Sequence, residues 1–244
     1  MRETVQDHEM EEISHYIAAL KSVDSDAFYD KEESEVWPLV HTAVDALLHL
    51  GPTVTPQLCS LLGTDFTWSC FYALKILRQT KDPQAVPALI TLLGRESDDT
   101  LACEETMLAL QDIGQPAVEP LLQELAIQFH GQHYNSYLVG ALTGIVGQTP
   151  YEYMVNIVQD YLQNPGKYHG WFHPGDFTFN FAKQQRTSAL PLLHRLLAVK
   201  NLDSHERQEI AETIEVLEHP DLYDERLRQT ISDVSGPLPT DVPR

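Results

Sequence analysis

The sequence predicts an all-α fold, an α-α superhelix (a solenoid) of about five to six helix pairs. Two observations carry this prediction. A motif of proline followed by leucines recurs, and its first three prolines lie 31 and 33 residues apart. An apolar stripe at helical spacing precedes each of these motifs. A fixed period of about 20 to 50 residues is typical of repeat architectures, in which each helix pair buries its apolar face by stacking on the next pair.

Residues 1–35 are predicted to form an acidic N-terminal capping helix and a connection. Ile13, Tyr16, Ile17 and Leu20 are spaced three and four residues apart within an otherwise acidic stretch. This spacing is typical of an amphipathic helix with one apolar face. The polar residues 24–35 then lead into the first repeat. A polar outer face is what the terminal element of a solenoid needs for solubility.

Residues 36–200 are predicted to form the repeats. The first helix of each pair has an apolar stripe: Val40, Val44, Leu47 and Leu48; Phe71, Leu74 and Leu77; Leu101, Met107, Leu110 and Ile113; Leu138, Leu142 and Ile145. Gly51, Gly114 and Gly147 follow three of these stripes, where a left-handed residue ends a helix at little cost.

The second helix of each pair is predicted at a recurring proline. These prolines are Pro56, Pro87, Pro120 and Pro191. The first turn of a helix tolerates proline because its N–H groups have no partner within the helix. The last gap is about twice the others, so Tyr153 to Leu162 is expected to be a degenerate second helix. The proline register predicts that Leu89 and Leu122 are fully buried between successive pairs.

A loop insertion rich in aromatic residues is predicted at residues 164–176. Two prolines and three glycines between Pro165 and Gly175 exclude a continuous helix there. Aromatic side chains on such a loop either pack on the core or bind a ligand. Both readings stay open at this stage. The candidate binding residues of the loop are Tyr168, His169, Trp171, Phe172 and His173.

The C-terminal part is predicted to end the solenoid. Ile210, Ile214 and Leu217 form an apolar stripe among recurrent acids, so residues 201–235 are expected to be capping helices. Residues 236–244 contain three prolines and are expected to form a flexible tail.

Two segments resemble a known family. The stretches Asp82–Leu93, which reads DPQAVPALITLL, and Ile113–Leu122, which reads IGQPAVEPLL, are similar to HEAT-like repeats of the phycobilin-lyase type (PBS lyase HEAT-like). The resemblance implies an armadillo-type α-α superhelix. It does not imply one function, because proteins with such repeats serve as scaffolds, inhibitors, chaperones and, in a few cases, enzymes.

The acidic net charge of the chain bears on which classes of macromolecule could bind it. The formal net charge is −20, so most of the surface is expected to repel nucleic acid. Residues 96–166 contain ten acids and no Lys or Arg. This span is interpreted either as a solvated acidic surface or as a docking surface for a basic protein, with Glu104 and Glu105 as candidate binding residues.

Metal and catalytic motifs are weak in this sequence. His130 and His133 are three residues apart and His169 and His173 four apart, but no HExxH or CxxC motif accompanies them. Cys59 and Cys103 fall in helical stripes and are interpreted as core residues. We therefore expect no metal, no cofactor and no catalytic residue. The absence of an N-terminal signal pattern and of a long apolar run predicts a cytoplasmic protein that does not cross a membrane.

The leading hypothesis is a non-enzymatic protein-binding module that grips a basic protein partner, as a scaffold, an inhibitor or immunity protein, or an assembly factor. The alternative is a phycobilin lyase-like or other chromophore-handling protein. Its ligand would carry propionates, which Lys167, Lys183, Arg186 and Arg195 could bind beside the aromatic loop. The oligomeric state is left open.

Overall fold

The computed structural model describes residues 2–24, 33–63, 66–94, 100–130, 136–168 and 174–222. All regular secondary structure in these ranges is helical, so the all-α prediction is confirmed. The chain divides into two compact units, residues 1–145 and 146–244. Each unit is described separately below. None of the helices described is long and apolar enough to cross a membrane.

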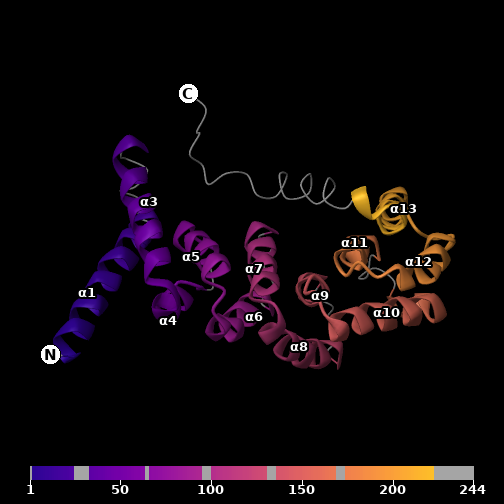
Figure 1. Cartoon of the computed structure of the whole chain (residues 1–244), viewed down its shortest axis with the longest axis horizontal. Coiled ribbons are helices and arrows are strands. Elements are labelled where there is room, and N and C mark those ends of the chain that lie inside the picture. Colours follow the sequence, from indigo (N-terminus) through magenta and orange to yellow (C-terminus); the bar gives the residue numbers. More distant parts are fainter. Residues whose placement is uncertain are drawn as a thin grey trace. The chain divides into compact units, whose positions relative to one another are not determined.

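The first unit is built from α-helices joined by short 3₁₀ turns (Figure 1). Its α-helices are α1 (Arg2–Lys21), α3 (Glu33–Leu50), α4 (Thr55–Cys59), α5 (Trp68–Thr80), α6 (Val86–Gly94), α7 (Thr100–Ile113), α8 (Val118–His130) and α9 (Ser136–Thr143). Its 3₁₀ turns are η1 (Ser22–Asp24), η2 (Gly51–Val54), η3 (Pro83–Ala85) and η4 (Gln115–Ala117).

In the second unit, too, the α-helices that the structure describes are joined by short 3₁₀ turns (Figure 1). Its α-helices are α10 (Gln148–Gln163), α11 (Gly175–Lys183), α12 (Leu190–Leu197) and α13 (Ser204–Glu218). Its 3₁₀ turns are η5 (Pro165–Tyr168), η6 (Thr187–Ala189) and η7 (Pro220–Leu222). Within this unit α13 packs on both α11 and α12.

The helices of the first unit form two layers. In Figure 1, α5, α7 and α9 form one row and α4, α6 and α8 form the row beneath it. Neighbours within the first row pack on each other, α5 on α7 and α7 on α9, and α6 packs on α8 in the second row. The N-terminal helix α1 packs on α3 and α5. This stacking of helix pairs is the predicted repeat arrangement, and it places α5 beside α7.

The turn between the two helices of a pair repeats in structure. Four of the first helices are followed by a residue with left-handed φ: Gly51 at 63°, Lys81 at 52°, Gly114 at 78° and Gln185 at 52°. The predicted helix-ending roles of Gly51 and Gly114 are therefore confirmed. Gly147 differs, because its φ of 166° is extended backbone that any residue adopts. Lys81 and Gln185 show that a side chain is tolerated at this turn despite its steric cost.

Burial follows the same register. The 3₁₀ turn of each pair ends on a residue that is almost or fully buried: Val54, Ala85, Ala117 and Ala189. The helix that follows has a fully buried leucine at its fourth position: Leu58, Leu89, Leu121 and Leu193. The prediction for Leu89 is confirmed. The prediction for Leu122 is wrong, because Leu121 occupies the equivalent position and Leu122 is part-exposed.

A close helix contact holds α7 against α9. A Cβ atom at Gly140 would lie 2.7 Å from Sδ of Met107, and one at Gly144 would lie 2.2 Å from the side chain of Gln111. Gln111 also donates a hydrogen bond of 3.0 Å from Nε2 to the carbonyl oxygen of Gly140. The two glycines therefore let α7 and α9 pack at short distance, which fixes the orientation of α7.

In the second unit the residues on either side of 169–173 are anchored. Tyr168 is buried, and its hydroxyl donates a hydrogen bond to Asp160 in α10. On the other side, a Cβ atom at Gly175 would lie 2.9 Å from Cα of Glu206, so α11 begins in close contact with α13. Glu206 forms a capping box with Asp203 at the start of α13. Helix α11 begins inside the range predicted as a loop.

Candidate functional site

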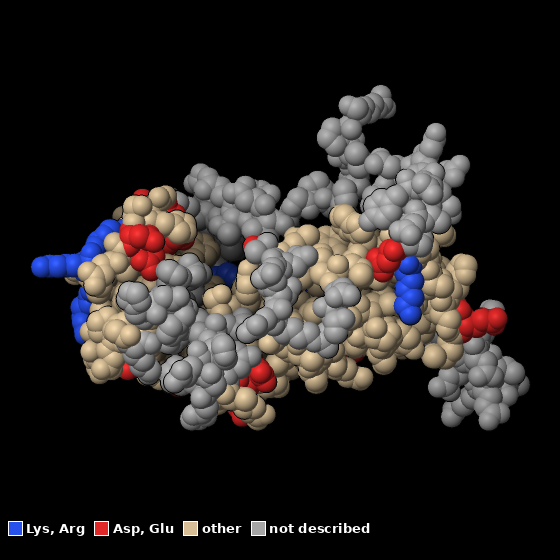
Figure 2. Space-filling model, turned by 180° about the vertical axis from the view of Figure 1, so that it is seen from behind, with Lys and Arg blue, Asp and Glu red and all other residues tan. Residues whose placement is uncertain are grey.

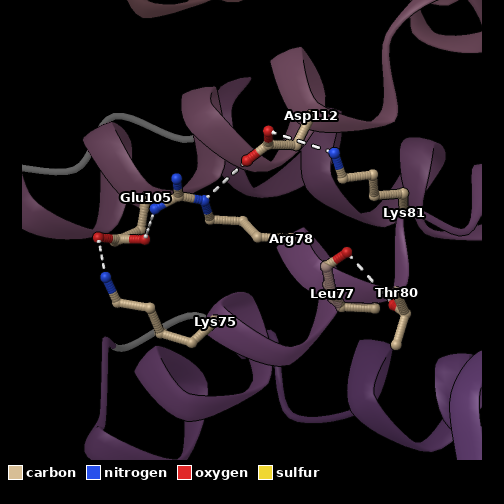
Figure 3. Close-up of polar contacts among 7 residues, drawn as sticks. All are labelled: Lys75, Leu77, Arg78, Thr80, Lys81, Glu105 and Asp112. Atoms are coloured by element: carbon tan, nitrogen blue, oxygen red, sulfur yellow. Dashed lines mark hydrogen bonds and ion pairs between the residues drawn. The ribbon is translucent and has the colours of Figure 1, made fainter. Parts of the chain in front are cut away.

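The polar interface between α5 and α7 is an ion-pair network (Figure 3). Nζ of Lys75 lies 2.7 Å from Oε1 of Glu105, and Nη1 of Arg78 lies 2.9 Å from Oε2 of the same carboxylate. Nε of Arg78 lies 3.0 Å from Oδ2 of Asp112, whose Oδ1 is 3.9 Å from Nζ of Lys81. Figure 3 shows the two acids of α7 facing Lys75 and Arg78 of α5 and Lys81, which directly follows that helix. The network therefore joins two successive repeats along their length.

Glu105 is the buried centre of this network. Its side chain is only 2% exposed, while those of Lys75 and Arg78 are 18% and 22% exposed. A buried carboxylate is stable only if its charge and its oxygen atoms are satisfied, and both oxygens accept from a cation here. Burial lowers the pKa of Arg78, but hydrogen bonds and charge from Glu105 and Asp112 raise it, and the net shift is upward. Arg78 therefore stays charged.

This network changes the interpretation of the acid-only span. Glu105 was a candidate for binding a basic partner, but the structure places its carboxylate in an internal ion pair with two cations of the preceding repeat. Asp112 is engaged by the same helix. On the face drawn in Figure 2, the acidic side chains that are described appear as separate spots among uncharged residues.

Aromatic rings gather at the N-terminal end of α5. The rings of Phe66 and Trp68 both pack edge-on against Phe71, with centroids 6.4 and 5.8 Å from its centroid. Nζ of Lys75 lies 5.1 Å from the Phe71 centroid, a cation–π distance. Phe71 is buried, whereas Trp68 is 43% exposed. The exposed Trp68 indole therefore packs on the buried ring of Phe71, which in turn contacts Lys75 of the ion-pair network.

The start of α5 is held by two caps. The hydroxyl of Thr67 accepts a hydrogen bond of 3.3 Å from the backbone N–H of Cys70. Oδ1 of Asp24, from the turn after α1, accepts one of 3.0 Å from the backbone N–H of Ser69. Its other oxygen accepts from the Ser69 hydroxyl. These contacts satisfy N–H groups that a helix leaves open at its start, and they place a carboxylate where the helix dipole favours one.

A pocket opens between these elements. It is lined by Asp24, Phe66, Thr67, Trp68 and Leu101, and its volume is about 350 Å³. Leu101 lies at the start of α7 and is 42% exposed. Two large apolar side chains from neighbouring repeats are thus both left in contact with solvent at one place. Such exposed apolar groups beside a concavity are typical of binding surfaces.

Glu104 lies one turn along α7 from Leu101. Glu104 is rotated by about 60° from Leu101 around α7, and it is not among the residues that line the pocket. Its side chain is part-exposed, and no described residue forms a hydrogen bond or an ion pair with its carboxylate. Glu104 and Glu105 are adjacent in sequence but differ in role. The carboxylate of Glu105 is paired within the fold, whereas that of Glu104 has no described partner.

Most candidates of the aromatic loop fall outside the described residues: His169, Trp171, Phe172 and His173. Tyr168 is described, and it packs edge-on against Tyr161 with ring centroids 5.7 Å apart. Burial, the hydrogen bond to Asp160 and the nearby negative charge raise the pKa of the Tyr168 phenol. The Tyr168 side chain is therefore buried and hydrogen-bonded within the second unit.

The basic residues considered for chromophore binding are distributed over several elements of the second unit. The guanidinium carbon of Arg186 lies 4.6 Å from the ring centroid of Tyr151, and the Tyr151 hydroxyl is 2.8 Å from Oγ of Ser188. Lys183 is part-exposed at the end of α11, and Arg195 is exposed on α12. The side chain of Lys167 lies outside the described residues.

Metal ligands do not cluster in the part of the chain that the structure describes: it has no group of three or more His, Cys, Asp or Glu suited to a metal ion. The side chains of His130 and His133 lie outside the described residues. Both Cys70 and Cys103 are buried, and Cys59 is part-exposed. Burial and the charge of Asp82 raise the pKa of the Cys59 thiol, which disfavours the reactive thiolate.

Sequence reasoning did not find the pocket between Trp68 and Leu101. The predicted stripe is wrong at Leu101, because nine helical residues separate it from Leu110 by a rotation of about 180°. Cys103 and Leu110 mark the buried face, and Leu101 is opposite. A helical-wheel count alone would have shown this. The aromatic residues at positions 66 and 68, directly before and at the start of a helix, were a second signal.

Comparison with protein families gives one match, to the PBS lyase HEAT-like repeat, over residues 70–95. The matched segment runs from α5 through the left-handed turn at Lys81 into α6. The same left-handed turn recurs in three further helix pairs, so the helical arrangement is consistent with a HEAT-like repeat protein, as the resemblance implied. Comparisons with curated proteins and with solved structures found no match.

Proposed function

We propose that the chain is a protein-binding HEAT-like repeat module whose partner is a basic protein. The observation that carries this proposal is the apolar pocket at the starts of α5 and α7, where Trp68 and Leu101 are 43% and 42% exposed. Tryptophan is enriched among the residues that dominate binding energy at protein interfaces. A scaffold, an inhibitor or immunity protein, and an assembly factor all use such a surface.

Rigidity and charge support the proposal. The pocket stands on helices that are tied together by Glu105 and by the caps of α5, so little conformational entropy is lost when a partner binds. Asp24 lines the pocket, and the chain as a whole carries a net charge of −20. Long-range attraction then favours a cationic partner and speeds its association.

An array of short peptides with defined basic, neutral and acidic sequences tests this function. The labelled protein is expected to bind basic peptides that contain large apolar residues and to bind them less at physiological than at low salt, because salt shortens the field to about 8 Å. Trp68→Ala should remove most of this binding. Gln79→Ala, an exposed position on the same helix, is the matched control. Equal binding of basic and acidic peptides would contradict the proposal.

A second candidate function is chromophore handling, which the family match and the Arg186–Tyr151 stack favour. A guanidinium held over an aromatic ring is suited to a flat ligand with carboxylates. Titration of the protein with a free bilin, followed by its absorbance spectrum, tests this function. Binding should change the spectrum, and Arg186→Ala should reduce the change more than Arg195→Ala does. An unchanged spectrum would exclude this candidate.

A further inference from the structure

The turn between α11 and α12 carries an exposed serine close to an arginine for which no described residue supplies a carboxylate. We propose that Ser188 is a phosphorylation site and that Arg186 and the Tyr151 hydroxyl bind its phosphate. This inference goes beyond the protein-binding function proposed above, because it concerns a covalent modification of the second unit. It follows from the fixed position of Arg186, from the contact between Ser188 and Tyr151, and from the exposure of the turn.

The guanidinium of Arg186 is held in place by contacts that do not neutralise its charge. Its central carbon lies 4.6 Å from the ring centroid of Tyr151, and Nη1 donates a hydrogen bond to Oε1 of Gln148. The Tyr151 ring packs edge-on against the buried Phe181, with ring centroids 6.0 Å apart. The carboxylate of Glu152 accepts from Nε2 of Gln148, so this amide stands between Arg186 and that acid in the chain of hydrogen bonds. A planar guanidinium that is positioned in this way is suited to binding the oxygens of a phosphate.

The hydroxyl of Ser188 contacts the same tyrosine. Its Oγ atom lies 2.8 Å from the hydroxyl oxygen of Tyr151, and Ser188 follows Arg186 by two residues. A phosphate on this Oγ atom therefore starts beside the Tyr151 hydroxyl, which can donate to it, and close to the guanidinium that lies over the ring. A phosphoserine carries about −1.5 to −2 charges at pH 7 and has three acceptor oxygens, so it can accept from both groups.

The turn is accessible to a modifying enzyme. Ser188 and Thr187 are exposed, and Gln185 before them has a left-handed φ of 52° that ends α11. A protein kinase would transfer the γ-phosphoryl group of a nucleoside triphosphate to Ser188. The bond from Oγ to phosphorus forms, the bond from phosphorus to the oxygen of the leaving nucleoside diphosphate breaks, and the hydroxyl proton passes to the catalytic base of the kinase. The basic residue two positions before Ser188 is the kind of charge pattern by which kinases select substrates.

The phosphate is expected to tie α12 to α10. Tyr151 belongs to α10, Ser188 lies in η6 directly before α12, and α10 packs on α12. The contact between Tyr151 and Ser188 is at present one neutral hydrogen bond. A phosphate replaces it by charge-assisted hydrogen bonds, which are roughly twice as strong. Phosphorylation of Ser188 should therefore raise the melting temperature of the second unit.

Full-length protein with phosphoserine incorporated at position 188 tests whether the fold binds the phosphate. Phosphorus NMR measures the second pKa of this phosphate against that of a phosphorylated peptide of residues 183–191, which contains Arg186 but not Tyr151. The pKa in the protein should be lower by about 0.5 or more, because a nearby cation and hydrogen-bond donors favour the dianion. Arg186→Gln should remove this difference, whereas Arg195→Gln, at an exposed arginine of α12, should preserve it. Circular dichroism checks that the variants are folded, and Tyr151→Phe, which keeps the ring, should reduce the difference in part.

A kinase reaction on the folded protein tests whether Ser188 can be modified. Incubation with ATP and a serine/threonine kinase that selects basic residues before its acceptor, followed by mass spectrometry, should locate a phosphate on Ser188. Ser188→Ala should lose this phosphate and Thr187→Ala should retain it. The proposal is overturned if Ser188 stays unmodified in the folded protein. It is also overturned if the phosphate has the same pKa in the protein as in the peptide, or keeps a lowered pKa in Arg186→Gln.

Discussion

Replacing Glu105 by Gln is expected to destabilise the first unit by about 2 to 3 kcal/mol. The change keeps the size of the side chain but removes a charge whose two oxygens accept from Lys75 and Arg78 at 2.7 and 2.9 Å. Removing one partner of a fully buried ion pair costs about 3 to 5 kcal/mol. The cost here is expected to be lower, because the two cations are 18% and 22% exposed and can recruit water.

Urea unfolding followed by circular dichroism measures this loss. Glu104→Gln is the matched control, since it makes the same chemical change one residue away at a carboxylate without a described partner. Its effect on the free energy of unfolding is expected to stay within about 0.5 kcal/mol. Combining Glu105→Gln with Lys75→Met in a double-mutant cycle should reveal a coupling of about 0.5 to 3 kcal/mol.

Two results would refute this reasoning. If Glu105→Gln and Glu104→Gln unfold at the same urea concentration, the ion pairs of Glu105 make no net contribution to the free energy of unfolding. If the double-mutant cycle gives no coupling between Glu105 and Lys75, any loss in the single variant comes from packing alone. Either result would remove the argument that this network stiffens the base of the Trp68 pocket.

Three further predictions concern the fold. Gly175→Ala should destabilise the second unit by about 1 to 3 kcal/mol, because the new Cβ would lie 2.9 Å from the backbone of α13. Gly166→Ala is the control and should cost little, because nothing lies within 4 Å of its added Cβ. Thermal melts compare the two variants. Leu121→Ala should cost about 2 to 5 kcal/mol in chemical denaturation and Leu122→Ala clearly less, since only Leu121 is fully buried. Burial raises the pKa of Tyr72 to about 12, from about 10 when unfolded. The unfolded chain therefore loses this proton first, so stability should fall as pH rises from about 10 to 12, and Tyr72→Phe should reduce that loss in a pH series of unfolding curves.

The helix pairs could be predicted because their signals are local. Apolar residues three and four apart, a glycine at a helix end and a proline in a first turn all act within one or two turns of chain. The error at Leu122 shows the limit of one such signal. Pro87 is the second residue of α6, but Pro120 is the third residue of α8. The proline therefore moves relative to the buried face, while the buried Val or Ala that ends the 3₁₀ turn of each pair does not.

The candidate site could be predicted only in part. The acid-only span contains both Glu104, whose carboxylate has no described partner, and Glu105, whose carboxylate pairs with Lys75 and Arg78. The two residues have the same side chain and are neighbours in sequence, so composition and charge counts treat them alike. Their difference is a rotation of about 100° around α7, which points Glu105 at α5. The pocket of Trp68 and Leu101 joins residues 33 positions apart, and it exists only because α5 and α7 stack.

The all-α class, the repeat period and most of the buried face of each helix follow from the order of residues along the chain, because helix formation and capping depend on residues within a few positions of each other. Which carboxylates are paired with a cation, in contrast, depends on how the helices stack in the folded chain. Lys75 neutralises a carboxylate 30 residues further along the chain, and Arg78 neutralises carboxylates 27 and 34 residues further along. Ion pairing depends on distance in space, which the stacking of α5 on α7 sets, and sums of charge along the sequence contain no such distance.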